Sequence, residues 1–138
     1  SQLGADRFNV YSAGSQPKGE VHPLALDTLR HLRFKDTGFR SKSWGEYSAA
    51  DAPAMDFVIT VCDNAANEVC PVWPGQPITA HWGVADPAAV DGSDEAKKRA
   101  FMDTAVTLKR RIEFLLSLPL AKLETLVIQR EVRDIGTR

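Results

Sequence analysis

Residues 57–62 read Phe-Val-Ile-Thr-Val-Cys, an almost unbroken run of apolar and β-branched side chains. Such side chains favour a strand, and a run without polar alternation is typical of a central parallel strand that is covered on both faces. The next seven residues, Asp63 to Val69, are mostly polar and suit a turn of helix, and three prolines between residues 71 and 77 predict a loop. We therefore expect a buried parallel strand that ends beside an irregular segment.

Strand and helix patterns alternate on both sides of this run. Two further strands are predicted, at Arg7 to Ala13 and at Ile78 to Trp82. Four helices are predicted: from Pro23, from Trp44 to about Ala50, from Ser93 to the break at Pro119, and from Ala121 to Gly136. This alternation predicts an α/β fold, with three α/β/α layers around a small parallel sheet, and residues 1–138 forming a single domain.

Composition excludes several classes of protein. The 138 residues carry a net charge of -1, with acidic and basic side chains mixed along the chain. A nucleic-acid-binding protein usually shows a strong basic excess, so no nucleic-acid partner is expected. No apolar run approaches the roughly 20 residues that a membrane helix requires, and the first residues do not resemble a signal peptide. We expect a cytoplasmic protein without a membrane partner.

The two cysteines, Cys62 and Cys70, are the first candidates for chemistry. One thiol at the end of a strand and a second on a polar segment suit disulfide exchange, in which one cysteine attacks a sulfur bond and the other resolves it. The alternative is that Cys62 is a small buried hydrophobe, and the spacing alone favours neither reading. A zinc site is less favoured because the cysteines lack matching third and fourth ligands nearby.

Asp86 is the second candidate, because it follows the strand at 78–82 and precedes Pro87. An aspartate on a loop at the carboxyl edge of a parallel sheet suits a general acid. The alternative, an ordinary Asp-Pro turn, is the commoner meaning of this pair. The basic run at 109–111 is expected to be a solvated face of the long helix, and His22 is expected to mark the entry to the helix at Pro23.

Together these motifs resemble the low-molecular-weight protein tyrosine phosphatases and the arsenate reductases of the same fold. The resemblance covers essentially the whole chain, and it depends on the order and spacing of several motifs. The matching segments are Tyr11-Ser12-Ala13-Gly14, Pro17 with Val21-His22-Pro23, Phe39-Arg40-Ser41-Lys42, the run at 57–62, and the segment from Trp82 to Pro87.

Within that family the residues resemble arsenate reductases more than phosphatases. Cys62 and Cys70 match positions where such reductases carry a cysteine relay, and the small residues 88–90 offer little to stack on a phenol ring. The resemblance implies catalytic roles for Cys62, Cys70 and Asp86, an arsenate or phosphate-like oxyanion as substrate, and no bound cofactor. Thioredoxin or a glutathione/glutaredoxin system is the implied electron donor. A phosphatase is the alternative function, and a non-catalytic or dimerising module is the third.

One element of the family pattern is absent from residues 1–138. The family begins with a strand, a phosphate-binding Cys-x5-Arg loop and a helix, and this sequence contains no Cys-x5-Arg. Ser1 to Gly4 resembles the last turn of that first helix, with Gly4 as its stop. The resemblance therefore implies an N-terminally incomplete domain that lacks its first strand and nucleophile loop. Such a chain is expected to be inactive alone, and it would be able to form a strand-swapped homodimer.

Overall fold

The computed structural model describes residues 3–4, 6–14, 19–49, 51–62 and 77–138, apart from the side chain of Cys62. Two compact units make up the chain. The first contains residues 1–44 and 86–109, and the second contains residues 45–85 and 110–138. Each unit is described by itself below, and the prediction that residues 1–138 form a single domain stays a prediction.

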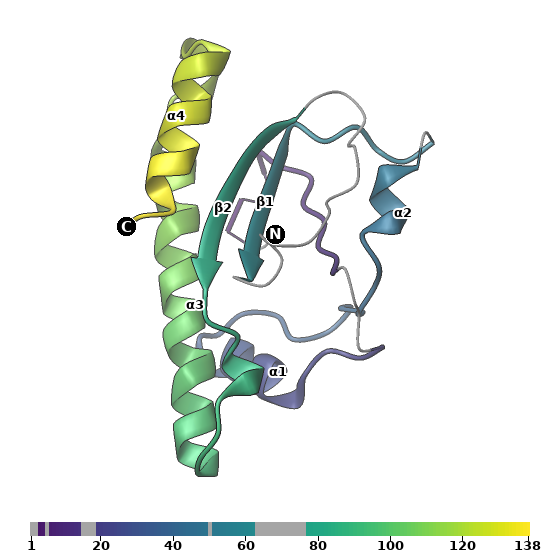
Figure 1. The fold of residues 1–138 in the computed structure, drawn as a ribbon, viewed down its shortest axis with the longest axis vertical. Coiled ribbons are helices and arrows are strands. Elements are labelled where there is room, and N and C mark those ends of the chain that lie inside the picture. The colour runs from purple at the N-terminus through teal and green to yellow at the C-terminus, as the bar shows by residue number, and fades with distance from the viewer. Residues whose placement is uncertain (1–2, 5, 15–18, 50, 63–76) are drawn as a thin grey trace. The chain divides into compact units, whose positions relative to one another are not determined.

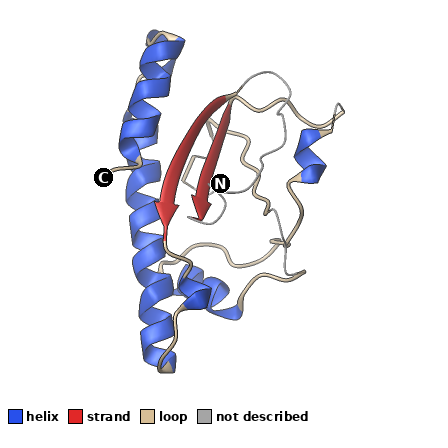
Figure 2. Ribbon diagram, viewed as in Figure 1, coloured by secondary structure: helices blue, strands red, loops and turns tan. Residues whose placement is uncertain are grey.

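A two-stranded parallel sheet lies at the centre of the second unit (Figures 1 and 2). Strand β1 (Phe57–Cys62) pairs with β2 (Ile78–Val84), and Phe57 is opposite Ile78. The predicted strands and their parallel pairing are confirmed, although β2 continues two residues past Trp82. The prediction that β1 is covered on both faces is not met within the described residues. The side chains of residues 57–60 are only partly buried, and Val61 is 39% exposed.

The register of the two strands changes near their carboxyl ends. Thr60 is opposite His81, whereas Cys62 is opposite Val84, so two steps along β1 match three steps along β2. One extra residue in β2 is a β-bulge, which twists the strand locally and ends regular pairing.

The hydrophobic core of the second unit lies between β2 and helix α4 (Thr125–Ile135). Alternation along β2 buries Ala80 and Trp82 on this side, and α4 contributes Val132 and Ile135. The indole Nε1 of Trp82 donates a hydrogen bond to the Val132 carbonyl oxygen at 2.8 Å. Because the pair is buried, this bond satisfies the polar atom of a large apolar side chain and fixes α4 along the strand.

Helix α3 (Asp94–Ser117) begins in the first unit and ends in the second. Its boundaries agree with the prediction. Ser93 caps the first turn, and its Oγ accepts a hydrogen bond from Ala96 N. The last helix begins later than predicted. A 3-10 turn (Leu120–Lys122) follows Pro119, Leu123 is extended, and α4 starts only at Thr125. Apolar spacing alone did not reveal this interruption.

Arg111 on α3 contradicts the prediction that the basic run at 109–111 is a solvated face. Its side chain is only 8% exposed. Nη1 donates to the carbonyl oxygens of Trp82 at 2.9 Å and Gly83 at 3.3 Å, and Nε donates to that of Arg138 at 3.1 Å. The guanidinium therefore satisfies backbone acceptors at the end of β2, which explains why a charge is tolerated there.

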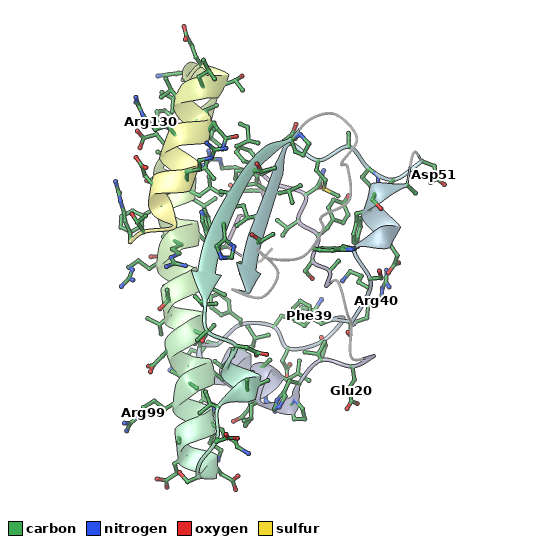
Figure 3. All side chains as sticks on the ribbon, in the orientation of Figure 1. Glu20, Phe39, Arg40, Asp51, Arg99 and Arg130 are labelled. Atoms are coloured by element: carbon green, nitrogen blue, oxygen red, sulfur yellow. The ribbon has the colours of Figure 1, made fainter. Side chains whose placement is uncertain are left out.

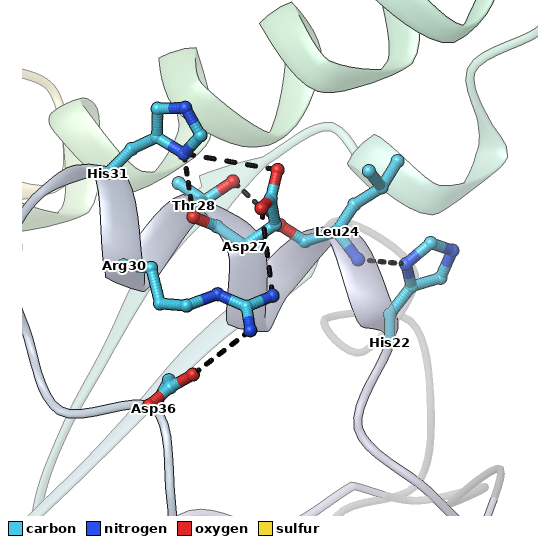
Figure 4. A network of polar contacts seen from close by, with 7 residues as sticks. All are labelled: His22, Leu24, Asp27, Thr28, Arg30, His31 and Asp36. Atoms are coloured by element: carbon cyan, nitrogen blue, oxygen red, sulfur yellow. Dashed lines mark hydrogen bonds and ion pairs between the residues drawn. The ribbon is translucent and has the colours of Figure 1, made fainter.

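In the first unit, α1 (Pro23–His31) begins as predicted. His22 is the N-cap, and its Nδ1 accepts a hydrogen bond from Leu24 N at 3.0 Å (Figure 4). On the helix surface Arg30 pairs with Asp27 at 3.6 Å and with Asp36 at 3.4 Å. These are solvated pairs, so each contributes about 1 kcal/mol or less. The start of the helix depends on the cap and on Pro23 more than on the ion pairs.

The predicted strand at Arg7 to Ala13 is wrong for the described residues. The structure has no strand there, and only Gly14 forms an isolated parallel bridge, with Ser43. Val10 and Tyr11 are 51% and 45% exposed. Alternating apolar residues favour an extended backbone, but a strand also needs a neighbour that supplies a ladder of hydrogen bonds. Leu3 and Gly4 lie in a turn, and Ser1 and Gln2, the rest of the predicted helix end, fall outside the described residues.

Two other features complete the fold. The short helix α2 (Gly45–Ser48) lies within the predicted range of 44–50. Among the described residues, no helix combines the length and apolar character needed to cross a membrane. The predicted turn of helix from Asp63 to Val69 and the proline-rich loop up to residue 76 lie outside the described residues.

Replacing Gly136 with alanine should destabilise the protein by about 1–3 kcal/mol. A Cβ at this position would lie 2.6 Å from the carbonyl oxygen of His81 and 3.0 Å from Cδ1 of Trp82. The contact with backbone cannot be relieved by a side-chain rotation. Urea unfolding followed by circular dichroism measures the change. Gly14→Ala is the matched control, because its Cβ would meet nothing within 4 Å, and equal losses in both variants would contradict the steric argument.

Replacing Arg111 with glutamine should cost about 1–3 kcal/mol, because the Trp82 and Gly83 carbonyl oxygens lose a buried donor. Arg110, the preceding residue on α3, is exposed. Arg110→Gln should therefore change the free energy of unfolding by no more than about 0.5 kcal/mol. Both variants remove one positive charge, so their difference isolates the buried hydrogen bonds. Similar unfolding curves for the two would show that Arg111 has no such role.

Candidate functional site

Cys62 is the last residue of β1, as the sequence predicts. Its backbone lies opposite Val84 at the carboxyl edge of the parallel pair, just beyond the bulge. Ligands of open parallel sheets bind at this edge, so the backbone position is suitable for a reacting group. The side chain of Cys62 and the whole of Cys70 fall outside the described residues. Their predicted pairing as a relay therefore stays a prediction.

A polar pair next to this edge was not identified from the sequence. Thr60 Oγ1 and His81 Nδ1 lie 2.6 Å apart, as side chains of register partners on β1 and β2. The His81 side chain is exposed, between the buried residues Ala80 and Trp82. The alternation of side chains along two parallel strands places Thr60 and His81 among the residues that could face each other. The register that brings Thr60 opposite His81 cannot be obtained from either strand alone.

Asp86 is the N-cap of a short 3-10 turn, Pro87–Ala89. Its Oδ1 accepts a hydrogen bond from Ala88 N at 2.9 Å, and the residue is exposed. This is the geometry of the Asp-Pro turn that the sequence offered as the alternative to catalysis. The cap hydrogen bond uses only Oδ1 of the carboxylate and does not involve the second oxygen. Asp86 belongs to the first unit and Cys62 to the second, so each is placed within its own unit.

A pocket of about 250 Å³ lies in the first unit, lined by residues 12–14, 20–21 and 40–42. The bridge between Gly14 and Ser43 holds two of these segments together, with Gly14 N donating to the Lys42 carbonyl oxygen at 2.9 Å. Gly19 N donates to Ser41 Oγ at 3.3 Å and connects the third segment. Two of the motifs that carried the family resemblance, at 11–14 and 39–42, thus meet in one place. Figure 3 labels Glu20 and Arg40 from this region.

Among the described residues, no group of three or more histidine, cysteine, aspartate or glutamate side chains is arranged to hold a metal ion.

Comparison with known proteins identifies the family. Residues 1–128 match the model for the low molecular weight phosphotyrosine protein phosphatase. A protein named arsenate reductase from Halalkalibacterium halodurans is 32% identical over 108 residues, which are 78% of this chain and 74% of the relative. Arsenate reductases from Oceanobacillus iheyensis and Bacillus licheniformis are 29% and 32% identical, with the same coverage of each chain. The chain therefore belongs to the low molecular weight phosphotyrosine protein phosphatase family.

Proposed function

We propose that this protein is an arsenate reductase that uses a cysteine relay. The observation that carries the proposal is the similarity, at about 30% identity over most of the chain, to proteins named arsenate reductase. The position of Cys62 at the carboxyl end of β1 supports it, because a reacting group there is accessible to a ligand at the sheet edge. Cys70 follows eight residues later and supplies a second thiol.

The proposed reaction begins with a thiolate that attacks arsenic and displaces one oxygen as water. This thiolate belongs to a Cys-x5-Arg loop, which residues 1–138 do not contain. Asp86 supplies the proton that the departing oxygen needs. The backbone N–H groups of such a loop bind the oxyanion, and its arginine offsets the negative charge.

Cys62 acts in the second step, as a thiolate that attacks the sulfur of the first cysteine. A disulfide forms, and the electron pair of the sulfur–arsenic bond stays on arsenic, which leaves as arsenite. Cys70 then attacks Cys62, releases the first thiolate and leaves a Cys62–Cys70 disulfide. The cysteines have lost two electrons and arsenic has gained two, so the reaction balances.

A thiol donor must return these two electrons before the next cycle. A thioredoxin dithiol does so in one encounter, and glutathione does so with two molecules, directly or through glutaredoxin. This donor is a partner that exchanges disulfides, and the proposal includes no bound cofactor. Dependence on such donors is consistent with a cytoplasmic protein, because the cytosol keeps thiols reduced.

The second candidate is a phosphatase that hydrolyses phosphomonoesters, which the description of the family favours. It would use the same Cys-x5-Arg loop and Asp86 but not Cys62 or Cys70. In that reaction Asp86 protonates the leaving alcohol, and water then releases the phosphate from the cysteine. The two functions therefore differ in their need for the second and third thiols.

Replacing Cys62 or Cys70 with serine should abolish arsenate turnover in the enzyme that includes the Cys-x5-Arg loop. Serine cannot form the disulfides of the second and third steps. Hydrolysis of p-nitrophenyl phosphate by the same variants is the control and should be retained, because that reaction needs neither thiol. Arsenite is measured with an excess of thioredoxin or glutathione. Arsenate turnover that persists in both variants would show the relay to be wrong. Ester hydrolysis without any arsenate reduction in the enzyme that keeps both cysteines would select the phosphatase.

Replacing Asp86 with asparagine should lower kcat by about 10²- to 10⁴-fold, for arsenate reduction or for ester hydrolysis. Asparagine is also a good N-cap, so its side-chain oxygen can keep the hydrogen bond from Ala88 N. The thermal unfolding midpoint should therefore remain unchanged, and KM should change little. A variant that retains full kcat would show that Asp86 only caps the turn.

A further inference from the structure

The pocket in the first unit has an apolar part, from Ala13 and Val21, and most of its polar side chains are able to donate hydrogen bonds. Its side chains that carry polar atoms are Ser12, Glu20, Arg40, Ser41 and Lys42, and only Glu20 is an obligate acceptor. Ser41 Oγ accepts from Gly19 N, and Ser12 Oγ accepts from Lys42 Nζ at 3.5 Å. Because each hydroxyl uses an acceptor lone pair in these contacts, its O–H remains able to donate to a ligand.

Lys42 carries the positive charge at the centre of this arrangement. Its side chain is partly buried, and Nζ donates to the Arg40 carbonyl oxygen at 3.3 Å as well as to Ser12. Both acceptors are neutral, and in the described part of the chain no carboxylate lies within 4.0 Å of Nζ. Glu20 lines the same pocket without forming an ion pair with Lys42. A partly desolvated ammonium without a counter-ion favours the binding of an anion.

We propose that the pocket formed by Ser12, Ser41 and Lys42 binds a tetrahedral oxyanion such as phosphate or arsenate. The Lys42 ammonium and the two hydroxyl groups donate to its oxygens, and Arg40 adds positive charge at the rim. A volume of about 250 Å³ accommodates the anion with several hydrating waters, since a water molecule takes about 30 Å³. Glu20 lines the same pocket and weakens the binding of an anion by charge repulsion.

The oxyanion pocket shares no residue with the proposed reaction. It uses neither Cys62, Cys70 nor Asp86, and it needs no Cys-x5-Arg loop. Only the choice of arsenate as a ligand rests on the proposed function, because the donor set recognises charge and shape and not arsenic itself. Binding and turnover can therefore be tested independently, and loss of one does not imply loss of the other.

The test is a titration of the ¹⁵N-labelled 138-residue chain with sodium phosphate, at ionic strength held constant with sodium chloride. We expect saturable shifts of the amide signals of residues 12–14 and 41–42. Arsenate should shift the same signals, and uncharged arsenous acid should not. The absence of saturable shifts would overturn the proposal, and so would acetate that binds as tightly as phosphate.

Substitutions assign the binding to the side chains. Lys42→Gln should weaken phosphate binding about tenfold or more, as expected for loss of a charge-assisted hydrogen bond, whereas Lys42→Arg should retain most of it. Glu20→Gln should tighten binding about two- to fivefold by removing the repulsion. This variant provides an independent test, with an effect of opposite sign, if Lys42→Gln does not fold.

Lys98→Gln is the matched control, because Lys98 is an exposed lysine on α3 of the same unit. Its affinity for phosphate should equal that of the unmodified chain. An equal loss in Lys98→Gln and Lys42→Gln would indicate diffuse attraction to a cationic surface and would overturn the pocket. Saturable phosphate binding by this chain, together with no arsenate turnover by the enzyme that includes the Cys-x5-Arg loop, would support the pocket and reject the reductase.

Discussion

Burial of Trp82 between β2 and α4 is the contact on which the second unit depends. The indole has only 3% of its surface exposed, and its N–H is bonded to the Val132 carbonyl oxygen. The apolar rings remove a large area from water, while the hydrogen bond allows the one polar atom to be buried at little cost. Gly136 and Arg111 belong to the same arrangement. The absence of a Cβ at position 136 lets α4 end against the backbone of β2, and Arg111 satisfies the carbonyl oxygens where that strand ends.

This packing places the candidate chemistry at one end of the sheet. With β2 held by α4, its parallel pairing with β1 brings Cys62 to the carboxyl edge, opposite Val84. Thr60 and His81 form a polar pair two residues earlier on β1 and three residues earlier on β2.

Family membership and local geometry support the function in different ways. The similarity to proteins named arsenate reductase supports the proposed overall reaction. The described geometry bears on the positions of single residues. Asp86 caps a 3-10 turn with one oxygen, which fixes its position without excluding a second role. The pocket around Lys42 lies beside the backbone bridge at Gly14, and neither cysteine lines it.

Much of the fold was predictable because its signals are local. Side-chain type and short spacing alone identified the strand at 57–62, the start of α1 at Pro23 and the extent of α3. Prediction failed for the segment from Arg7 to Ala13, whose alternation is that of a strand but which gains only one bridge, through Gly14. It also failed for Arg111, because a basic run does not show which of its members points into the protein. For the same local reason, Cys62 was correctly placed at the end of a strand and Asp86 after one.

The sequence by itself determined the α/β class, the parallel pair of strands and the starts of α1 and α3, and it suggested the candidate reactive residues. These follow from chemistry within a few neighbouring residues. Only the tertiary structure decided the register with its bulge, the burial of Arg111, and the meeting of Ser12, Ser41 and Lys42 in one pocket. Each of these depends on contacts between segments about 20 or more residues apart. Such contacts form only when burial of apolar surface offsets the entropy of ordering the chain between them.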